Sequence, residues 1–176
     1  MTAGELWAFS LEFYRRNGVP EACIALQDAH GADVDMMLFA LSCARRRRRL
    51  VATELDAIDA AVVAWGKTVV QPLRLATHAL KPAPLHLFDP AAASALRERL
   101  LSAEIEAGRQ QQAAMEALAP TLGDAEPGPA ASDNLLAFAR HAGIPPDAPP
   151  FAVLLRAFAG PRRYDALSSA SAARRA

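Results

Sequence analysis

The stretch FSLEFYRRNGVPEACIALQDAHGADVDMMLFALSCA, residues 9–44, decides the fold class of this chain. Apolar residues recur every three or four positions before Asn17-Gly18, where the first helix is expected to stop. Pro20 suits the start of a second helix, because the backbone there needs no N–H donor inside the helix. Gly31 should end that helix, since glycine readily adopts the left-handed conformation after a helix.

A third helix is predicted after Asp33, whose side chain is typical of an N-cap. Between Met36 and Ala44 the only polar residue is Ser42. A helix that is apolar on every side is normally buried on every side, so we expect this one at the centre of the fold. The residues expected to be almost inaccessible are Met37, Leu38 and Leu41.

Two longer helices are predicted next, as an antiparallel pair. One runs over residues 53–80, with Thr53 and Asp56 as a variant capping box, and it should kink rather than end at Pro72. The other starts at Asp89-Pro90 and reaches about Leu118. The apolar stripe of the first consists of Leu55, Ile58, Val62, Trp65, Val69, Leu73, Ala76 and Leu80.

The composition changes at Pro120, where PTLGDAEPGPAASDN is typical of a linker. Two short helices are predicted beyond it, at residues 134–141 and 151–159, followed by a frayed tail over residues 165–176. The sequence thus predicts an all-α fold: a bundle of about five helices over residues 1–122, and a segment 123–176 with two short accessory helices.

The composition excludes several classes of protein. The 176 residues carry 19 basic and 19 acidic side chains, so no net charge draws the chain to nucleic acid or an anionic membrane. No secretory signal and no apolar run long enough to span a membrane is visible, which favours a cytoplasmic protein. Cys23 and Cys43 are then expected to be reduced thiols in the core.

One block resembles the N-terminal signature of an uncharacterised bacterial family of small proteins. Its letters are F-S-L-x-F-Y-x-x-x-G-V-x-x-A-C-x-x-L-Q-x-x-H-G-x-D-V, and they correspond here to residues 9–34. The resemblance implies a helical, soluble bacterial protein and brings no activity with it. Asp35 stands where the signature leads us to expect asparagine, which adds a negative charge at the start of the third helix.

One candidate site surrounds the turn between the second and third helices. Gln27 lies one turn before His30 on the same helix face, and Asp33 and Asp35 follow the turn. Caps and turn contacts explain most of these residues, and no recognised zinc spacing is present, so we expect neither a metal nor a cofactor. If the site is instead a ligand pocket, the residues expected to line it are Phe13, Tyr14, Cys23, Gln27, His30, Asp33 and Met37.

A second candidate is the run Arg45, Arg46, Arg47, Arg48 and Arg49, which follows the third helix. Cations suit the negative end of a helix, which is a structural explanation. A protein partner or a phosphate group is the functional explanation. Sequence-specific binding to nucleic acid is not expected, because no aromatic residues alternate with the arginines.

Three functional hypotheses follow from these features. The leading one is a non-enzymatic adaptor that presents the arginine run and the aromatic first helix, with Trp7, Phe9, Phe13 and Tyr14, to a protein partner. The alternative is a helical protein that binds a small molecule near Gln27 and His30. A third is an enzyme. Its site would have to be an unfamiliar one, since no known catalytic motif occurs in the sequence. The sequence leaves the oligomeric state open.

Overall fold

The computed structural model describes residues 1–81 and 89–160, and all regular structure within these ranges is helical. The predicted all-α class is confirmed. The connection between the two longer predicted helices, residues 82–88, and the tail predicted to be frayed, residues 165–176, fall outside the described residues. The helices are α1 (Glu5–Tyr14), α2 (Val19–His30), α3 (Val34–Arg45), α4 (Ala52–Trp65), the π-helical segment η1 (Gly66–Val70), α5 (Gln71–Ala79), α6 (Pro90–Ala117), α7 (Pro127–His141) and α8 (Pro149–Ala159).

Local signals set most helix ends. Gly31 ends α2 in the left-handed conformation, with φ of 66°, and the Asp33 carboxylate accepts a hydrogen bond of 3.1 Å from the Met36 N–H. The capping box predicted at Thr53 and Asp56 is wrong, because other residues cap α4. The helix begins one residue earlier, and the Glu54 carboxylate accepts a 3.0 Å hydrogen bond from the Val51 N–H, because glutamate at the third helical position can reach back to the cap.

The third helix lies at the centre of the fold, as predicted. Nearly all of α3 is buried, and Met37, Leu38 and Leu41 are at most 2% exposed. From α1, Leu6, Phe9 and Phe13 join the same hydrophobic core, and the rings of Phe9 and Phe13 stack with centroids 5.4 Å apart.

The two C-terminal helices also belong to this core, which differs from the accessory role expected from sequence. α7 begins at Pro127, within the stretch predicted to be a linker, because proline is tolerated in the first turn of a helix. Ala130, Ala131 and Phe138 are buried in the same cluster as α3. The predicted boundary at residue 122 therefore crosses one continuous hydrophobic core.

A buried asparagine fixes α7 to the end of α3. The side chain of Asn134 is fully buried, and its Nδ2 donates hydrogen bonds of 2.9 Å to the carbonyls of Ala40 and Arg48. Its Oδ1 accepts a 2.8 Å bond from the Leu50 N–H. Every polar atom of this amide thus has a partner, as burial demands.

The helix predicted over residues 53–80 runs continuously as α4, η1 and α5, but its apolar phase changes in the middle. Trp65 is 40% exposed, whereas the next residue, Gly66, is buried. In the same way Val70 and Thr77 are buried one position after the predicted Val69 and Ala76. The π turn explains this shift, because it takes one more residue than an α turn.

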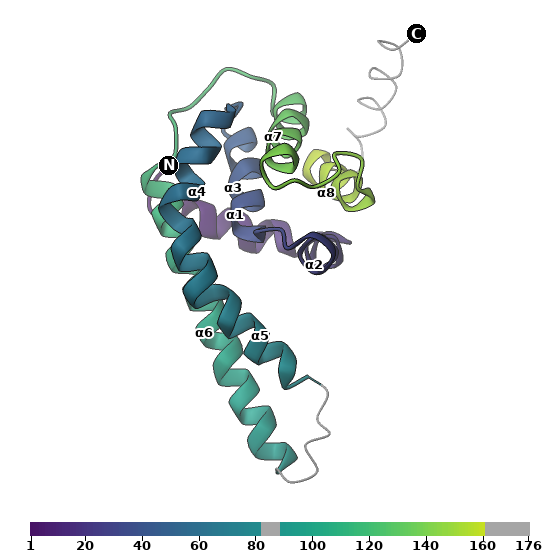
Figure 1. The fold of residues 1–176 in the computed structure, drawn as a ribbon. Helices are drawn as coiled ribbons and strands as arrows, with labels where there is room; N and C mark the ends of the chain where they lie inside the picture. Colours follow the sequence, from purple (N-terminus) through teal and green to yellow (C-terminus); the bar gives the residue numbers. More distant parts are fainter. Residues whose placement is uncertain (82–88, 161–176) are drawn as a thin grey trace.

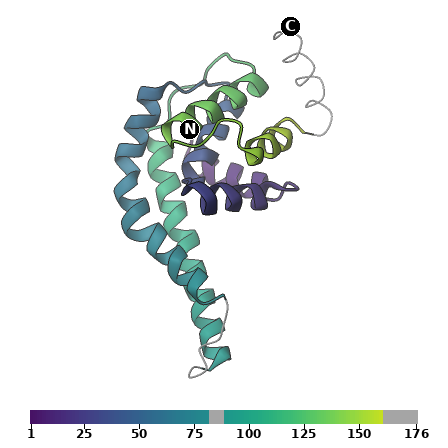
Figure 2. The same ribbon diagram turned by 45° about the vertical axis from the view of Figure 1, so that its right-hand side comes forward.

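Two regions differ sharply in shape. We call α1, α2, α3, α7 and α8 the head, and α5 with residues 90–106 of α6 the arm. Figure 1 shows the arm as an antiparallel helix pair that runs away from the head, and Figure 2 shows the same from another side. α4 packs against α7, and the C-terminal half of α6 packs against α1 and α3. These two segments continue into the two helices of the arm.

Candidate functional site

An open cavity of about 390 Å³ lies where the arm leaves the head. The turn between α2 and α3 forms one wall, η1 and α5 form another, and α6 closes it. Its polar lining includes Gln27, Asp28, Asp33, Asp35, Arg74 and Gln111. We call it the junction cavity. Its volume lies within the range of small-molecule sites.

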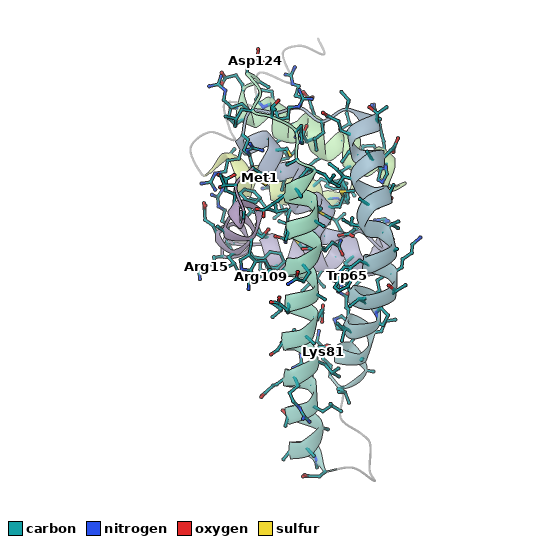
Figure 3. The ribbon with its side chains drawn as sticks, turned by 90° about the vertical axis from the view of Figure 1, so that its left-hand side faces the viewer. Met1, Arg15, Trp65, Lys81, Arg109 and Asp124 are labelled. Carbon is teal, nitrogen blue, oxygen red and sulfur yellow. The ribbon has the colours of Figure 1, made fainter. Side chains whose placement is uncertain are left out.

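Trp65 marks the level of the junction. Figure 3 shows this side chain between α4 and α6, above Lys81, which follows the end of α5 part-way down the arm. Its indole N–H donates a 2.9 Å hydrogen bond to the carbonyl of Ala107. This bond holds the start of η1 against α6, where the cavity is formed.

Two neighbouring glutamines of α6 each bind an aspartate at the start of α3. The Nε2 of Gln111 donates to Asp33 Oδ2 at 2.7 Å, and the Nε2 of Gln112 donates to Asp35 Oδ1 at 2.6 Å. Both glutamines are 2% exposed. The pairs fix the N-terminus of α3 to the C-terminal part of α6, with charge-assisted hydrogen bonds.

The two glutamines differ in their carbonyl oxygens. Gln112 Oε1 accepts a 3.1 Å hydrogen bond from the hydroxyl of Ser10. Gln111 Oε1 is buried and has no hydrogen-bond partner among the described residues. Such an atom is rare in proteins and costs about 1–3 kcal/mol when nothing satisfies it. Gln111 lines the junction cavity, and a Cβ atom added at Gly66 would lie 3.4 Å from this oxygen.

Asp35 is the carboxyl that the site perturbs most. Burial, and then the nearby charge of Asp33, raise its pKa from 3.8 to about 7, although the hydrogen bond from Gln112 opposes this. Arg74 also lowers the pKa, but that guanidinium is paired with Glu104 at 3.0 Å. At neutral pH this carboxyl is therefore divided between its charged and neutral forms.

Asp35 also borders a second hollow of about 280 Å³ between α1, α3 and α6. The two hollows share Asp35, Val70 and Arg74, and the second is lined further by Trp7, Tyr14 and Ile105. At Gly108 a side-chain carbon would lie 3.1 Å from Asp35 Oδ2, so glycine lets this carboxyl approach α6. Asp35 thus forms part of the partition between two hollows.

The predicted pocket residues are divided by the structure. Gln27 and Asp33 line the junction cavity, and Tyr14 lines the second hollow. His30 is exposed at the end of α2 and is not among the residues around either hollow. The remaining three, Phe13, Cys23 and Met37, are fully buried in the hydrophobic core. Two of the seven predicted residues, Gln27 and Asp33, therefore border the junction cavity. That the predicted residues bind a ligand stays a prediction.

The thiols are poorly suited to act as nucleophiles. Burial raises the pKa of Cys23 to about 11 and that of Cys43 to about 12, so both stay protonated at neutral pH. Burial also raises the pKa of Tyr14, beside Cys23. Among the described residues, no group of three or more histidine, cysteine or acidic side chains is arranged to hold a metal ion.

The five arginines each contact another part of the chain. Arg45 pairs with Glu12 at 2.6 Å, and Arg46 donates to the carbonyl of Pro120 at 3.2 Å. The other three also have partners: Arg47 contacts the Asp124 carbonyl and Glu126, Arg48 pairs with Glu54, and Arg49 pairs with Asp133. These contacts support the structural explanation of the run. Binding of a partner there stays a prediction.

Sequence reasoning missed the residues that α5 and α6 supply to the site, above all Arg74, Glu104, Gln111 and Gln112. Two signals could have found them. The run Gln110–Gln112 interrupts an alanine-rich helix, and Gly66 and Gly108 occur inside helices, where an isolated glycine indicates a close approach.

Residues 5–115 match the family described as Protein of unknown function (DUF2390). This chain belongs to that family. No curated protein and no solved structure matches it.

The DUF2390 match includes α1 to α5 and nearly all of α6, so every residue of the junction cavity lies inside it. α7 and α8 lie beyond the match, although they complete the core around α3. The match confirms that the chain belongs to an uncharacterised family, as the resemblance drawn from residues 9–34 implied. Within the described part of this DUF2390 protein, no helix is long and apolar enough to cross a membrane.

Proposed function

We propose that this protein binds a small molecule in the junction cavity. The observation that carries the proposal is the buried Oε1 of Gln111, which has no hydrogen-bond partner among the described residues and belongs to a side chain that lines the open junction cavity. Buried polar atoms in folded proteins almost always have partners, so a ligand that supplies a donor is a physical reason for this arrangement.

Two further features support a binding site at this position. The π segment η1 forms part of the wall, and π turns occur frequently at functional sites. The cavity also combines apolar surface from Val70 and Leu75 with a few polar groups, the mixture typical of ligand pockets.

The test is an NMR screen of the full chain against a library of metabolites. A ligand of the junction cavity should shift the amide signals of residues 31–35, 66–71 and 111, which surround the cavity. The same titration should leave the signals around Met1, Phe9 and Arg46 unchanged, because they line a separate hollow. If every compound that binds shifts only this second group, or if none binds, the proposed function is wrong.

The adaptor hypothesis, which the sequence favoured, has weaker support. Its two surfaces were the arginine run and the aromatic first helix, but the arginines have partners within the chain, and Phe9 and Phe13 are buried. The hypothesis keeps a direct test in the substitution of three arginines, described below. An enzymatic role has one supporting feature, the raised pKa of Asp35 in a cavity.

A further inference from the structure

We infer that the junction cavity selects small organic cations that carry N–H groups, such as a primary ammonium or a guanidinium. This inference rests on the proposed function and adds the chemical class of the ligand. The contacts that point to it are two acceptor oxygens, the space beside Gly66, and the charges around the cavity.

Two oxygens face the side of Gly66 from which a side chain would project. A Cβ atom there would lie 3.4 Å from Gln111 Oε1 and 3.7 Å from Asp33 Oδ2. Because residue 66 is glycine, the space in front of its backbone is not filled by a side chain of its own. A ligand nitrogen in that space can approach both oxygens, and only a donor satisfies Gln111 Oε1.

The charges around the cavity favour a cation. Asp28, Asp33 and Asp35 contribute carboxyl groups, while the guanidinium of Arg74 is already paired with Glu104 at 3.0 Å. His78 is the other basic residue of the lining and is exposed. An anionic ligand would add to the negative charge of the aspartates, whereas an ammonium or guanidinium group would reduce it.

Gln112 provides a matched control on the same helix. Its burial and its bond to an aspartate resemble those of Gln111, but its carbonyl oxygen already accepts a hydrogen bond from Ser10. Methionine is similar in size to glutamine, so either replacement removes a buried amide group and changes the packing little. Gln112→Met removes two hydrogen bonds and Gln111→Met removes one, so the Gln112 variant should lose more stability, whereas only Gln111→Met should lose affinity for the ligand.

The probes are five small compounds: n-butylamine, n-butylguanidine, n-butanol, butyrate and tetramethylammonium. Titration of the full chain, followed by the amide signal of Gly66, gives each dissociation constant. We expect the amine and the guanidine to bind at least roughly tenfold more tightly than the other three, which lack the charge or the N–H donors. Tetramethylammonium separates the contribution of charge from that of hydrogen bonding.

Gly66→Ala is the decisive variant. Its methyl group would make only ordinary van der Waals contacts, and the backbone at Gly66 is helical, with φ of −53° and ψ of −48°. Alanine in a helix is more stable than glycine, so the urea midpoint should stay the same or rise. The same methyl stands between the two oxygens, and we expect at least a roughly tenfold loss of amine affinity.

The outcomes separate this inference from the proposed function. If butanol or butyrate binds in the cavity as tightly as butylamine, the cavity binds small molecules but does not select cations with N–H groups. If Gly66→Ala and Gln111→Met bind butylamine as tightly as the parent protein does, the ligand nitrogen does not lie beside Gly66 and this inference is wrong. If neither the probes nor the metabolite library binds in the cavity, the proposed function itself fails.

Discussion

The head and the arm differ in how tightly their side chains are packed. In the head, α3 is surrounded by other helices, and Leu38 is 2% exposed. In the arm, Leu75 is 70% exposed and Ile105 is 50% exposed, and one ion pair, Arg74 with Glu104, joins α5 to α6. The stability of the chain therefore resides in the head. The junction cavity lies where a strongly packed region meets a weakly packed one, a common position for elements that respond to ligands.

The largest expected effect is the loss of the head when its C-terminal helices are removed. Deletion of residues 123–176 should abolish cooperative unfolding in urea, because α7 covers one side of α3 and Asn134 binds its end. The sequence alone predicts the opposite result, a folded core over residues 1–122. In the full chain, Phe138→Ala should cost about 3–5 kcal/mol, since this ring is 1% exposed. A truncated chain that keeps a sharp transition at the same midpoint would contradict the single core.

A pair of leucine substitutions compares the two regions directly. Leu38→Ala in the head should lower the free energy of unfolding by about 2–5 kcal/mol, because it leaves a cavity in a packed core. Leu101→Ala in the arm should change it by less than about 0.5 kcal/mol, because this side chain is 37% exposed and alanine favours helix. Urea denaturation of both variants measures the difference. Equal losses would show that the arm is packed as tightly as the head.

Asp35 gives a prediction for the junction that depends on pH. Its folded-state pKa of about 7 lies above the value of about 3.9 for an unfolded chain, so its contribution to stability falls as pH rises from about 4 to 7. Asparagine carries no charge there. Asp35→Asn should be more stable than the parent by about 1–3 kcal/mol at pH 8, with little difference at pH 4.

The measurement is the free energy of unfolding of both proteins across this range of pH. The other charged groups that face Asp35, which are Asp33, Arg74 and Glu104, remain in the variant. Their titration therefore affects both proteins, and the difference between the two curves reports on Asp35. Curves that run parallel from pH 4 to pH 8 would contradict the raised pKa.

A small effect on stability is also expected at the arginine run, at the edge of the head. Replacement of Arg47, Arg48 and Arg49 by glutamine should cost about 1 kcal/mol in total, because two of their ion pairs are exposed, the pair of Arg48 with Glu54 is only partly buried, and such pairs contribute little individually. Affinity capture with the parent and the variant tests the adaptor hypothesis at the same time. Loss of a partner whose binding depends on salt would support that hypothesis, whereas unchanged capture would remove the arginines from it.

Much of the fold could be predicted from the sequence because its signals are local. Asp33 and Gly31 act through contacts within a few residues, and the apolar run of α3 permits only a buried helix. The start of α7 was missed because prolines and glycines are typical of both linkers and first helical turns. Only packing against α3 decides between them, and packing is not a local property.

The candidate site was predicted only in part for the same reason. Gln27 and Asp33 were found because they lie on one turn of the chain. Gln111 is 78 positions from Asp33, and Gly66 enters the cavity because the π turn brings it to the buried face. A single sequence gives no distances between such residues. The pairing of two adjacent glutamines with two aspartates required the folded chain.

The π turn of η1 also determines the direction in which the arm faces. Each residue of an α-helix turns the chain by about 100°, so one residue more or fewer at this point rotates everything beyond it by that angle. Deletion of a single residue within 66–70 would leave α4 and α5 helical, but it would turn Arg74 and Thr77 away from α6. The extra residue therefore sets the rotation of α5, so that its buried face meets α6 and Arg74 borders the cavity at the base of the arm.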